Sequence, residues 1–243
     1  MLLTPARRRG HEILDDPSID PALAERSLHD VAMANRFFGG RRAILREVRA
    51  LLDASGREPA RKPGGDDTLT LLDIGTGLGD IPAAAQRMAA ARRRPMTTIG
   101  LELEPLLARA AQRACTSAVA ADAMQLPFAD ASIDIVTCSQ VLHHFENADA
   151  ERLLRECSRV ARHAVVIGDL RRSWLAVAGL WTSSFALGFH PVSRHDGVVS
   201  ILRGFTLSEL FALVERATGR RPSVRHALGW RVTATWRTGA SAS

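Results

Sequence analysis

From Leu69 onward, hydrophobic positions follow two different periods along the chain. Short apolar runs alternate with longer segments in which apolar residues recur every three or four positions. The short runs predict strands near 69–74, 97–102, 117–121, 133–138 and 163–168. The longer segments predict helices near 80–91, 105–114 and 149–161. Strands that alternate with helices in this order predict an α/β fold, with a parallel sheet covered by helices on both faces.

The two ends of the chain carry different patterns. Apolar residues at helical spacing predict helices over Pro21–Leu28 and Arg36–Leu52, within a helical segment at 11–54. Ser55–Asp67 is rich in Gly, Pro and charged residues, which predicts a linker. Towards the other end we predict a helix at 206–218 and two strands, at 223–228 and 230–237, joined around Leu228 and Gly229.

The segment Leu71–Asp80 contains the most informative local pattern. An apolar strand ends at Ile74, glycines follow at every second position (Gly75, Gly77 and Gly79), and a helical pattern begins at Ile81. Residues without side chains let the backbone turn tightly and approach a ligand at the end of the strand. A dinucleotide-binding loop would carry glycine or alanine where this chain has Asp80. The pattern therefore favours a different nucleoside-like ligand.

Three later segments complete this pattern. Thr97–Glu102 ends in a carboxylate 23 residues after Gly79, close to the offset at which an acidic residue meets ribose hydroxyls. Ala120–Phe128 contains Asp122, and Ser132–Phe145 joins an apolar strand to a loop with two histidines. In this order the segments resemble the class I methyltransferases that depend on S-adenosylmethionine (SAM). They are similar to the members that act on small molecules, including those of quinone biosynthesis.

The resemblance implies a fold and a division of the chain. The expected fold is a Rossmann-like, doubly wound sheet of seven mostly parallel strands, with an antiparallel edge hairpin, a helical amino-terminal cap and a lid insertion. We expect residues 1–67 to form the helical extension and linker, and 68–170 the SAM-binding core. Residues 171–205 would form the lid, and 206–243 the last helix and the edge hairpin of the same domain.

The resemblance also implies SAM as the cofactor and a set of residues that bind it. Glu102 would bind the ribose, Asp122 the adenine amine, and Asp73 the methionine ammonium, directly or through water. Asp73 has an alternative role, which is to brace the glycine loop. The full expected set is Asp73, Gly75, Thr76, Gly77, Gly79, Glu102, Leu103, Asp122, Ala123, Cys138 and Ser139.

Trp174–Phe189 is a run of 16 residues without a charge. It is shorter than the roughly 20 residues needed to span a bilayer. Its place after the fifth strand is where related methyltransferases insert a substrate lid, and its aromatic and aliphatic residues would suit an apolar or aromatic acceptor. Core packing, a dimer patch and peripheral membrane contact through 174–189 are the alternatives, the last favoured by the flanking Arg171, Arg172 and Arg194.

Methyl transfer depends chiefly on alignment of the acceptor with the methyl group, and a base helps only certain acceptors. Candidate bases are the histidines at 143 and 144, which follow the fourth strand, and those at 190 and 195 in the lid segment. We select His144 and His195 as the catalytic candidates. The alternatives are that the histidine pair shapes the pocket wall, and that His195 and Asp196 form a turn in which the Asp side chain bonds to the backbone.

Composition limits the remaining choices. The chain has 32 basic and 26 acidic residues, a formal charge of +6, and a single lysine, Lys62. The excess of arginine is consistent with coding bias, although the carboxy-terminal third is strongly basic. The start of the chain lacks an apolar stretch after its basic residues, so we expect a cytoplasmic protein. Three widely spaced cysteines predict neither a disulfide framework nor a zinc site, and we expect no metal ion.

The expected function is O- or C-methylation of an apolar or aromatic small molecule, phenolic, quinone-like or polyketide-like, by a monomer or homodimer. Methylation of RNA or protein is the first alternative. However, Cys138-Ser139-Gln140-Val141 lacks the Asn/Asp-Pro-Pro-aromatic motif of amino-methylating enzymes, and aromatic residues make up only 5%, which does not favour nucleic acid. Further alternatives are a catalytically silent SAM-binding protein and a nicotinamide-dependent oxidoreductase, the latter disfavoured by Asp80.

Overall fold

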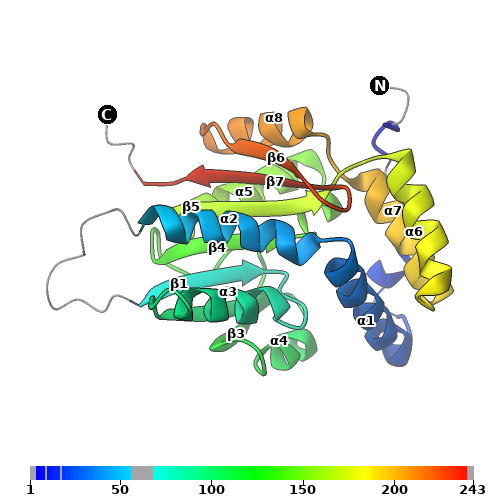
Figure 1. The fold of residues 1–243 in the computed structure, drawn as a ribbon, viewed down its shortest axis with the longest axis horizontal. Helices are drawn as coiled ribbons and strands as arrows, with labels where there is room; N and C mark the ends of the chain where they lie inside the picture. The colour runs from blue at the N-terminus through cyan, green and yellow to red at the C-terminus, as the bar shows by residue number, and fades with distance from the viewer. Residues whose placement is uncertain (1–3, 9, 17, 56–67, 240–243) are drawn as a thin grey trace, which may run out of the picture.

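A seven-stranded sheet forms the centre of the protein (Figure 1). The computed structural model describes residues 4–8, 10–16, 18–55 and 68–239. The strands lie in the order β3-β2-β1-β4-β5-β7-β6. Only β7 runs antiparallel to its neighbours, β5 and β6. The strands are β1 (Leu69–Ile74), β2 (Met96–Glu102), β3 (Ser117–Ala120), β4 (Ile133–Ser139), β5 (Ala161–Leu170), β6 (Ser223–Ala227) and β7 (Arg231–Arg237). The predicted α/β fold, mostly parallel with an antiparallel edge hairpin, is confirmed.

The helices follow the predicted alternation closely. They are α1 (Pro21–Phe37), α2 (Gly40–Ser55), α3 (Asp80–Ala90), α4 (Pro105–Ala111), α5 (Asn147–Val160), α6 (Trp174–Ala186), α7 (Pro191–Arg203) and α8 (Leu207–Thr218), with short 3-10 turns η1 (Ile13–Asp15) and η2 (Leu142–His144). The linker predicted at Ser55–Asp67 lies, beyond Ser55, outside the described residues. Helix α4 ends three residues earlier than predicted, because the N–H groups of Arg113 and Ala114 donate to the carbonyl groups three residues before them and tighten the chain into turns.

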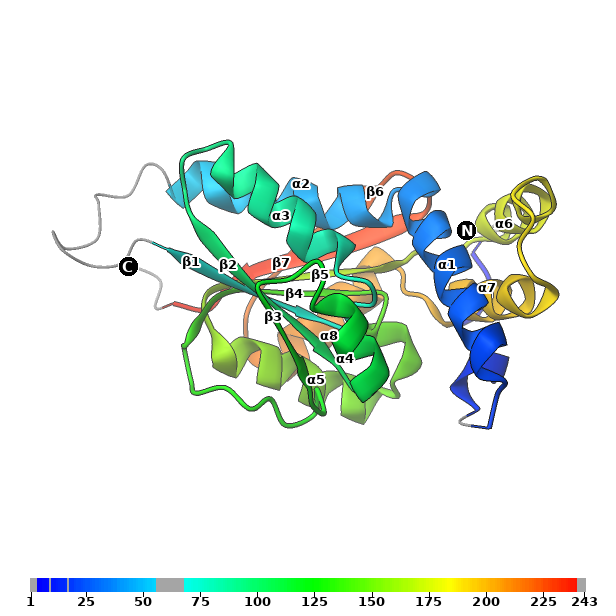
Figure 2. The ribbon, with the colours of Figure 1, turned by 90° about the horizontal axis from the view of Figure 1, so that it is seen from below.

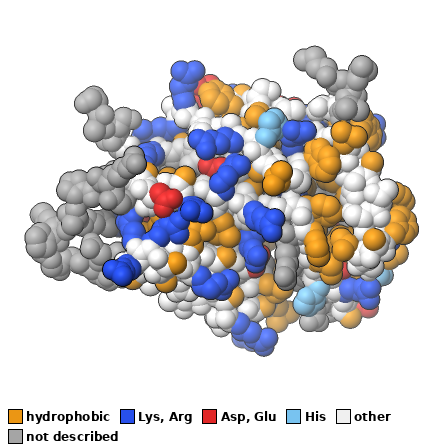
Figure 3. Space-filling model, in the orientation of Figure 1, with side chains coloured by type: hydrophobic (Ala, Val, Ile, Leu, Met, Phe, Trp, Pro, Cys, Tyr) orange, Lys and Arg blue, Asp and Glu red, His pale blue; other side chains and the backbone are white. Residues whose placement is uncertain are grey.

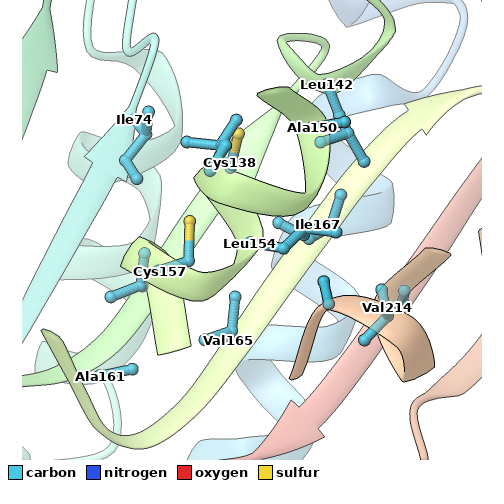
Figure 4. Packing of buried hydrophobic residues seen from close by; sticks show 14 of the residues in the cluster. Ile74, Cys138, Leu142, Ala150, Leu154, Cys157, Ala161, Val165, Ile167 and Val214 are labelled. Carbon is cyan, nitrogen blue, oxygen red and sulfur yellow. The ribbon is translucent and has the colours of Figure 1, made fainter. Parts of the chain in front are cut away.

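Helices cover both faces of the sheet (Figure 2). On one face, α2 and α3 bury a cluster that includes Ile44 and Ala85 against Leu71 of β1. On the other face, α5 and α8 bury a larger cluster that includes Leu154 and Val214 (Figure 4). Burial of apolar side chains on both faces explains why the central strands are nearly continuous apolar runs. The sheet is thereby held rigid, and its carboxyl edge is a fixed platform for a site.

The predicted lid segment consists of two helices, α6 and α7, which lie with α1 beyond the carboxyl ends of the strands (Figures 1 and 2). Gly188, at φ +67°, allows the turn between α6 and α7, and Pro191 occupies the first turn of α7. A third, smaller apolar cluster with Leu180, Phe189 and Ile201 holds these helices together. No helix among the described residues has the length and apolar character needed to cross a membrane.

The outer face of α6 leaves large apolar side chains exposed. Trp174, Leu175, Trp181 and Phe185 are between 41% and 57% exposed. Hydrophobic side chains gather over this end of the molecule in Figure 3, whereas basic side chains spread over the region of α2. The Arg194 guanidinium lies 3.7 Å from the centre of the Phe185 ring, and that of Arg8 lies 5.8 Å from the centre of the Trp174 ring. Arginines therefore flank an exposed aromatic surface.

Candidate active site at the carboxyl edge of the sheet

The loop between β1 and α3 requires glycine at all three predicted positions. Gly75, Gly77 and Gly79 have φ values of +66°, +56° and +75°. This left-handed region is costly for residues with a Cβ atom. Gly75 lies close to the loop that follows β4. A Cβ added to Gly75 would lie 2.3 Å from Cγ2 of Val141. A Cβ on Gly79 would lie 2.9 Å from Cβ of Ala114.

Gly77 differs from the other two glycines. A Cβ added to it would meet nothing within 4 Å. The described structure therefore leaves open space over Gly77, whereas Gly75 and Gly79 are in close contact with neighbouring loops. This is the place in the loop where a ligand can approach the backbone.

Glu102 ends β2 directly beside this open space. Its Oε1 accepts a hydrogen bond from the Gly77 N–H, and burial raises the pKa of its carboxyl group. The next residue, Leu103, has a side chain that is 68% exposed. A carboxylate and an uncovered apolar side chain thus lie together, as a ligand with hydroxyl groups and a flat ring would require.

Asp73 is buried beneath the glycine loop, with 1% of its surface exposed. Its Oδ1 accepts a hydrogen bond of 2.6 Å from the Thr137 hydroxyl. Burial, with a smaller effect of the nearby carboxylates of Asp80 and Glu102, raises the pKa of Asp73 to about 7 despite the Thr137 hydrogen bond, which lowers it. Burial also raises the pKa of Asp80. Three carboxyl groups with raised pKa values therefore surround the loop, and a positively charged ligand would relieve their repulsion.

Two residues of the predicted cofactor set point their side chains away from the loop surface. Thr76 is 5% exposed and packs under the loop, where its Cγ2 would lie 2.7 Å from a Cβ on Gly100. Cys138 is fully buried in the cluster under α5 (Figure 4), and burial raises the pKa of its thiol well above the usual value. Packing uses both side chains, so the predicted contact of these two residues with a cofactor would have to come from their backbone atoms.

The remaining predicted residues lie at the same edge of the sheet. Asp122 follows β3, is exposed, and accepts a hydrogen bond of 2.8 Å from the Met124 N–H. Ala123 is partly buried against the core, and Ser139 ends β4 with intermediate exposure. Parallel strands with adjacent carboxyl ends bring these residues, distant in sequence, to one edge.

A cavity of about 260 Å³ lies beyond this edge, between the strand ends and the helices α1, α6 and α7. Its apolar wall comes from residues such as Ala34, Phe38, Leu180, Phe189 and Ile201. Gln140, at φ +57°, lines it from the loop after β4. The same loop contributes Val141, which contacts Gly75, so one loop separates the open space over the glycines from the cavity.

His143 is the buried polar centre of this cavity. Its Nδ1 lies 2.7 Å from Oδ1 of Asp169, and its backbone N–H donates to the other oxygen of that carboxylate at 3.1 Å. Burial by itself would raise the pKa of Asp169, but the interaction with His143 lowers it below the usual value. Arg231 also lines the cavity, and burial lowers its pKa to about 10. Asp169 could have been noticed in the sequence as the single acidic residue within the apolar fifth strand.

The structure separates the two predicted catalytic histidines. His144 lines the cavity, and its Nδ1 lies 4.0 Å from Oε2 of Glu12. His195 is outside the cavity lining, and its side chain is 52% exposed and lies 2.8 Å from Asp196. The turn considered for these two residues is wrong, because both belong to helix α7. Asp196 does bond to the backbone, but to the N–H groups of Ile13 and Leu14 in a distant segment.

Comparison with known proteins finds a family model that matches the segment containing these residues. Residues 72–167 match the family model described as "Methyltransferase domain". This segment is therefore similar to methyltransferase domains. The resemblance to SAM-dependent methyltransferases, which the sequence motifs predicted, is thereby confirmed. The matched segment contains the glycine loop, Glu102, Asp122 and the two histidines after β4.

Two curated relatives are similar over parts of the chain. The 27-O-demethylrifamycin SV methyltransferase of Amycolatopsis mediterranei (strain S699) is 39% identical over 108 residues, 41% of this chain and 38% of that protein. An uncharacterized methyltransferase of Mycobacterium sp. (strain JLS) is 31% identical over 163 residues, 66% of this chain and 54% of that protein. The chain therefore spans about half or less of the curated relatives it matches.

A solved structure is similar over nearly the whole chain. The magnesium protoporphyrin IX methyltransferase of Synechocystis, with bound S-adenosylhomocysteine, has a TM-score of 0.52 and 15% identity, and the match covers 91% of this chain and 89% of that one. At this level of identity the likeness concerns the fold, which agrees with the seven-stranded sheet described above.

Proposed function

We propose that the protein transfers the methyl group of SAM to an apolar or aromatic small molecule, as an O-methyltransferase. The observation that carries this proposal is the adjacency of two spaces across one loop. The open space over Gly77 suits a cofactor, and the cavity under α6 and α7 suits an acceptor. The loop after β4, with Gln140 and Val141, separates the two.

The residues present fit SAM. The open space over Gly77 lets the ligand approach the protein backbone. Glu102 offers a carboxylate to the ribose hydroxyls, and Leu103 offers an exposed apolar surface to the adenine. Asp73 and Asp80 supply negative charge for the methionine ammonium. When bound, SAM supplies a methyl group on a positively charged sulfur, which is an activated electrophile. The contribution of the chain is then to bind, orient and exclude water.

The cavity supports an apolar acceptor of limited size. Its volume of about 260 Å³ lies near the lower end of ligand sites, and the helices α1, α6 and α7 form part of its wall. Its wall is mostly apolar, but His143, His144 and the carboxyl groups of Glu12, Asp30 and Asp196 add polar groups to the lining. A hydroxyl group on the acceptor would supply the partner that Nε2 of His143 lacks among the described residues, which favours oxygen over carbon as the methylated atom. The rifamycin relative, whose name describes O-methylation of a small molecule, supports the same class.

The catalytic proposal therefore rests on the histidine pair after β4 and no longer includes His195. His144 stays a candidate because it lines the cavity, and His143 joins it because Asp169 holds its ring. Asp169 holds the imidazole through Nδ1, which leaves Nε2 of this cavity-lining residue as the nitrogen that can accept or share the acceptor's proton. Lid helices α6 and α7 would exclude water from this end of the cavity.

The first experiment is a calorimetric titration of the purified protein with SAM, S-adenosylhomocysteine and NADH, followed by assays of labelled methyl transfer to phenolic and hydroquinone acceptors. We expect micromolar binding of the first two ligands, none of NADH, and transfer to at least one acceptor. Binding without transfer to small molecules, but with transfer to RNA or protein, would replace the acceptor class. Absence of SAM binding would refute the proposed function.

We also propose that the exposed face of α6 contacts an anionic membrane surface, from which an apolar acceptor could enter. Four large apolar side chains and the flanking Arg8 and Arg194 support this, because such a face buries apolar area while its arginines meet lipid phosphates. Co-sedimentation with vesicles tests it: binding to phosphatidylglycerol vesicles, reduced by Trp181→Ala and by salt, is expected. Binding to neither anionic nor neutral vesicles would refute it, and self-association lost in Trp181→Ala would assign the face to a homodimer.

A further inference from the structure

Three potential metal ligands meet at the polar end of the acceptor cavity. Glu12 comes from the segment before α1, and His143 and His144 come from the 3-10 turn after β4. One ligand atom from each lies within 4.8 Å of the others. Glu12 is far in sequence from the two histidines, so no short sequence motif contains all three residues.

His143 is already held in the orientation that a metal ligand needs. Its side chain is 3% exposed, and Asp169 is bonded to Nδ1 at 2.7 Å. The other ring nitrogen, Nε2, is buried and has no hydrogen-bond partner among the described residues. With Nδ1 donating to the carboxylate, Nε2 carries a lone pair, and the residue itself lines the cavity. Histidines that bind metals are oriented in this way by a carboxylate behind the ring.

Glu12 is equally fixed in position. It is 5% exposed, and its Oε1 accepts hydrogen bonds from the Ser200 hydroxyl at 2.8 Å and from Arg203 at 2.9 Å. Its Oε2 lies 4.0 Å from Nδ1 of His144. The ring of His144 in turn lies against that of His143, with 4.2 Å between ring centres. Helix α7 thus holds the carboxylate against both imidazoles.

The charges around the cavity favour a cation. Among the described residues, four carboxylates line or back it and two arginines oppose them: Glu12, Asp30, Asp169 and Asp196 against Arg203 and Arg231. The exposed His195 shares Asp196. The imidazoles, when neutral, add two nitrogen ligands without adding charge.

We propose that Glu12, His143 and His144 bind one divalent transition-metal ion. Two imidazoles and one carboxylate suit Zn²⁺, Fe²⁺ or Co²⁺ rather than Mg²⁺ or Ca²⁺. Bonds of about 2.1 Å place the ligands of a tetrahedral ion about 3.4 Å apart. The three groups would therefore have to approach one another by up to about 1.4 Å, which rotation of the partly exposed His144 side chain can supply.

The remaining coordination position would face the acceptor cavity. A hydroxyl oxygen bound there would lose its proton more readily, because the ion stabilises the oxyanion. This consequence rests on the proposed methyl transfer, whereas the metal site itself does not. The sequence pattern predicted no metal ion, because Glu12 and the histidine pair show no ligand spacing.

The test is a titration of the tag-free, metal-stripped protein with Co²⁺, followed by visible absorption, and competition with Zn²⁺. We expect one saturable site, weakened at least tenfold in His144→Ala and in Glu12→Gln. The matched control is His195→Ala, which removes an imidazole beside a carboxylate but outside the cavity, and it should bind Co²⁺ as the unchanged protein does. His143→Gln is added only if its melting temperature shows that it folds.

Three outcomes would overturn the proposal: no saturable Co²⁺ binding, equal binding by all variants, or a sulfur-to-cobalt charge-transfer band, which would place the ion at Cys115. SAM titration of the same samples separates this failure from that of the proposed function. Unchanged SAM binding and chelator-resistant methyl transfer, without a Co²⁺ site, would leave the function standing and reduce His143 to a proton acceptor held by Asp169.

Discussion

The glycine loop and the acceptor cavity lie at the same edge of the sheet, but they are built differently. The loop is a continuous segment between β1 and α3, and its shape comes from the backbone, with positive φ at Gly75, Gly77 and Gly79. The cavity is assembled from side chains between Glu12 and Arg231. A backbone site depends on a few local residues, whereas a side-chain site depends on the packing of distant segments. A backbone site can therefore bind the same ligand in many proteins, whereas the residues of a side-chain site can differ between proteins that take different acceptors.

The largest effect is expected from Gly77→Ala. Its Cβ would enter the open space assigned to SAM, so SAM affinity should fall at least about a hundredfold, roughly 2.7 kcal/mol. Calorimetry measures the affinity and thermal unfolding the fold. The matched control is Gly219→Ala, at φ +67° with nothing within 4 Å of an added Cβ, at the end of α8. Equal SAM affinity in Gly77→Ala and the control would remove the cofactor from this loop.

The next effect concerns the carboxylate at the end of β2. Glu102→Ala should weaken SAM binding at least about tenfold, roughly 1.4 kcal/mol, because it removes hydrogen bonds to the ribose. Glu104→Ala is its control, since Glu104 is an exposed carboxylate two residues away whose side chain makes no capping hydrogen bond. If both variants bind SAM equally well, Glu102 merely braces Gly77.

Asp73 predicts that the binding of SAM depends on pH. Its pKa of about 7 in the unliganded protein means that it must lose a proton to bind the methionine ammonium. SAM affinity should therefore fall about tenfold as the pH is lowered from 8 to 6, and Asp73→Asn should be weaker but nearly independent of pH. Calorimetry across this range, in two buffers of different ionisation heat, also measures the proton released on binding.

The same carboxylate should lower the stability of the unliganded protein. The folded pKa lies above the unfolded value of 3.8, so the contribution of Asp73 to the free energy of unfolding is lost as the pH rises from about 4 through about 7. Asp73→Asn should therefore raise the melting temperature at pH 8, by about 2–4 °C for each 1 kcal/mol recovered. A lower melting temperature would show that the Thr137 hydrogen bond outweighs the burial of charge.

The smallest effect is expected in the cavity. Leu180→Ala should raise the acceptor KM severalfold with little change in the KM for SAM, because Leu180 lines the cavity wall. Trp181→Ala, its neighbour on the outer face of α6, is the control and should leave both KM values nearly unchanged. Equal changes in both constants for Leu180→Ala would indicate loss of stability instead of loss of acceptor contact.

Much of the fold could be predicted because its signals are local. The alternation of apolar runs and helical periods placed β1 to β5, α3, α5 and the edge hairpin within a few residues. The boundaries that differ, such as the end of α4, depend on single turn hydrogen bonds. The tight packing of the Thr76 side chain was not predictable, because Thr76 lies in a loop and packs against Gly100 of β2, which is distant in sequence.

The sequence by itself determined the sheet, its helices, the glycine loop and the acids at the ends of β1 and β2, since each depends on short periods and on backbone geometry. Tertiary structure alone decided the cavity. It brought Glu12 from the amino-terminal segment to His143 and His144, placed Asp169 behind the ring, and turned His195 outward on α7. The physical reason is that side-chain sites are made by long-range packing, in which contact partners are set by how helices lie on the sheet and leave no trace in residue spacing.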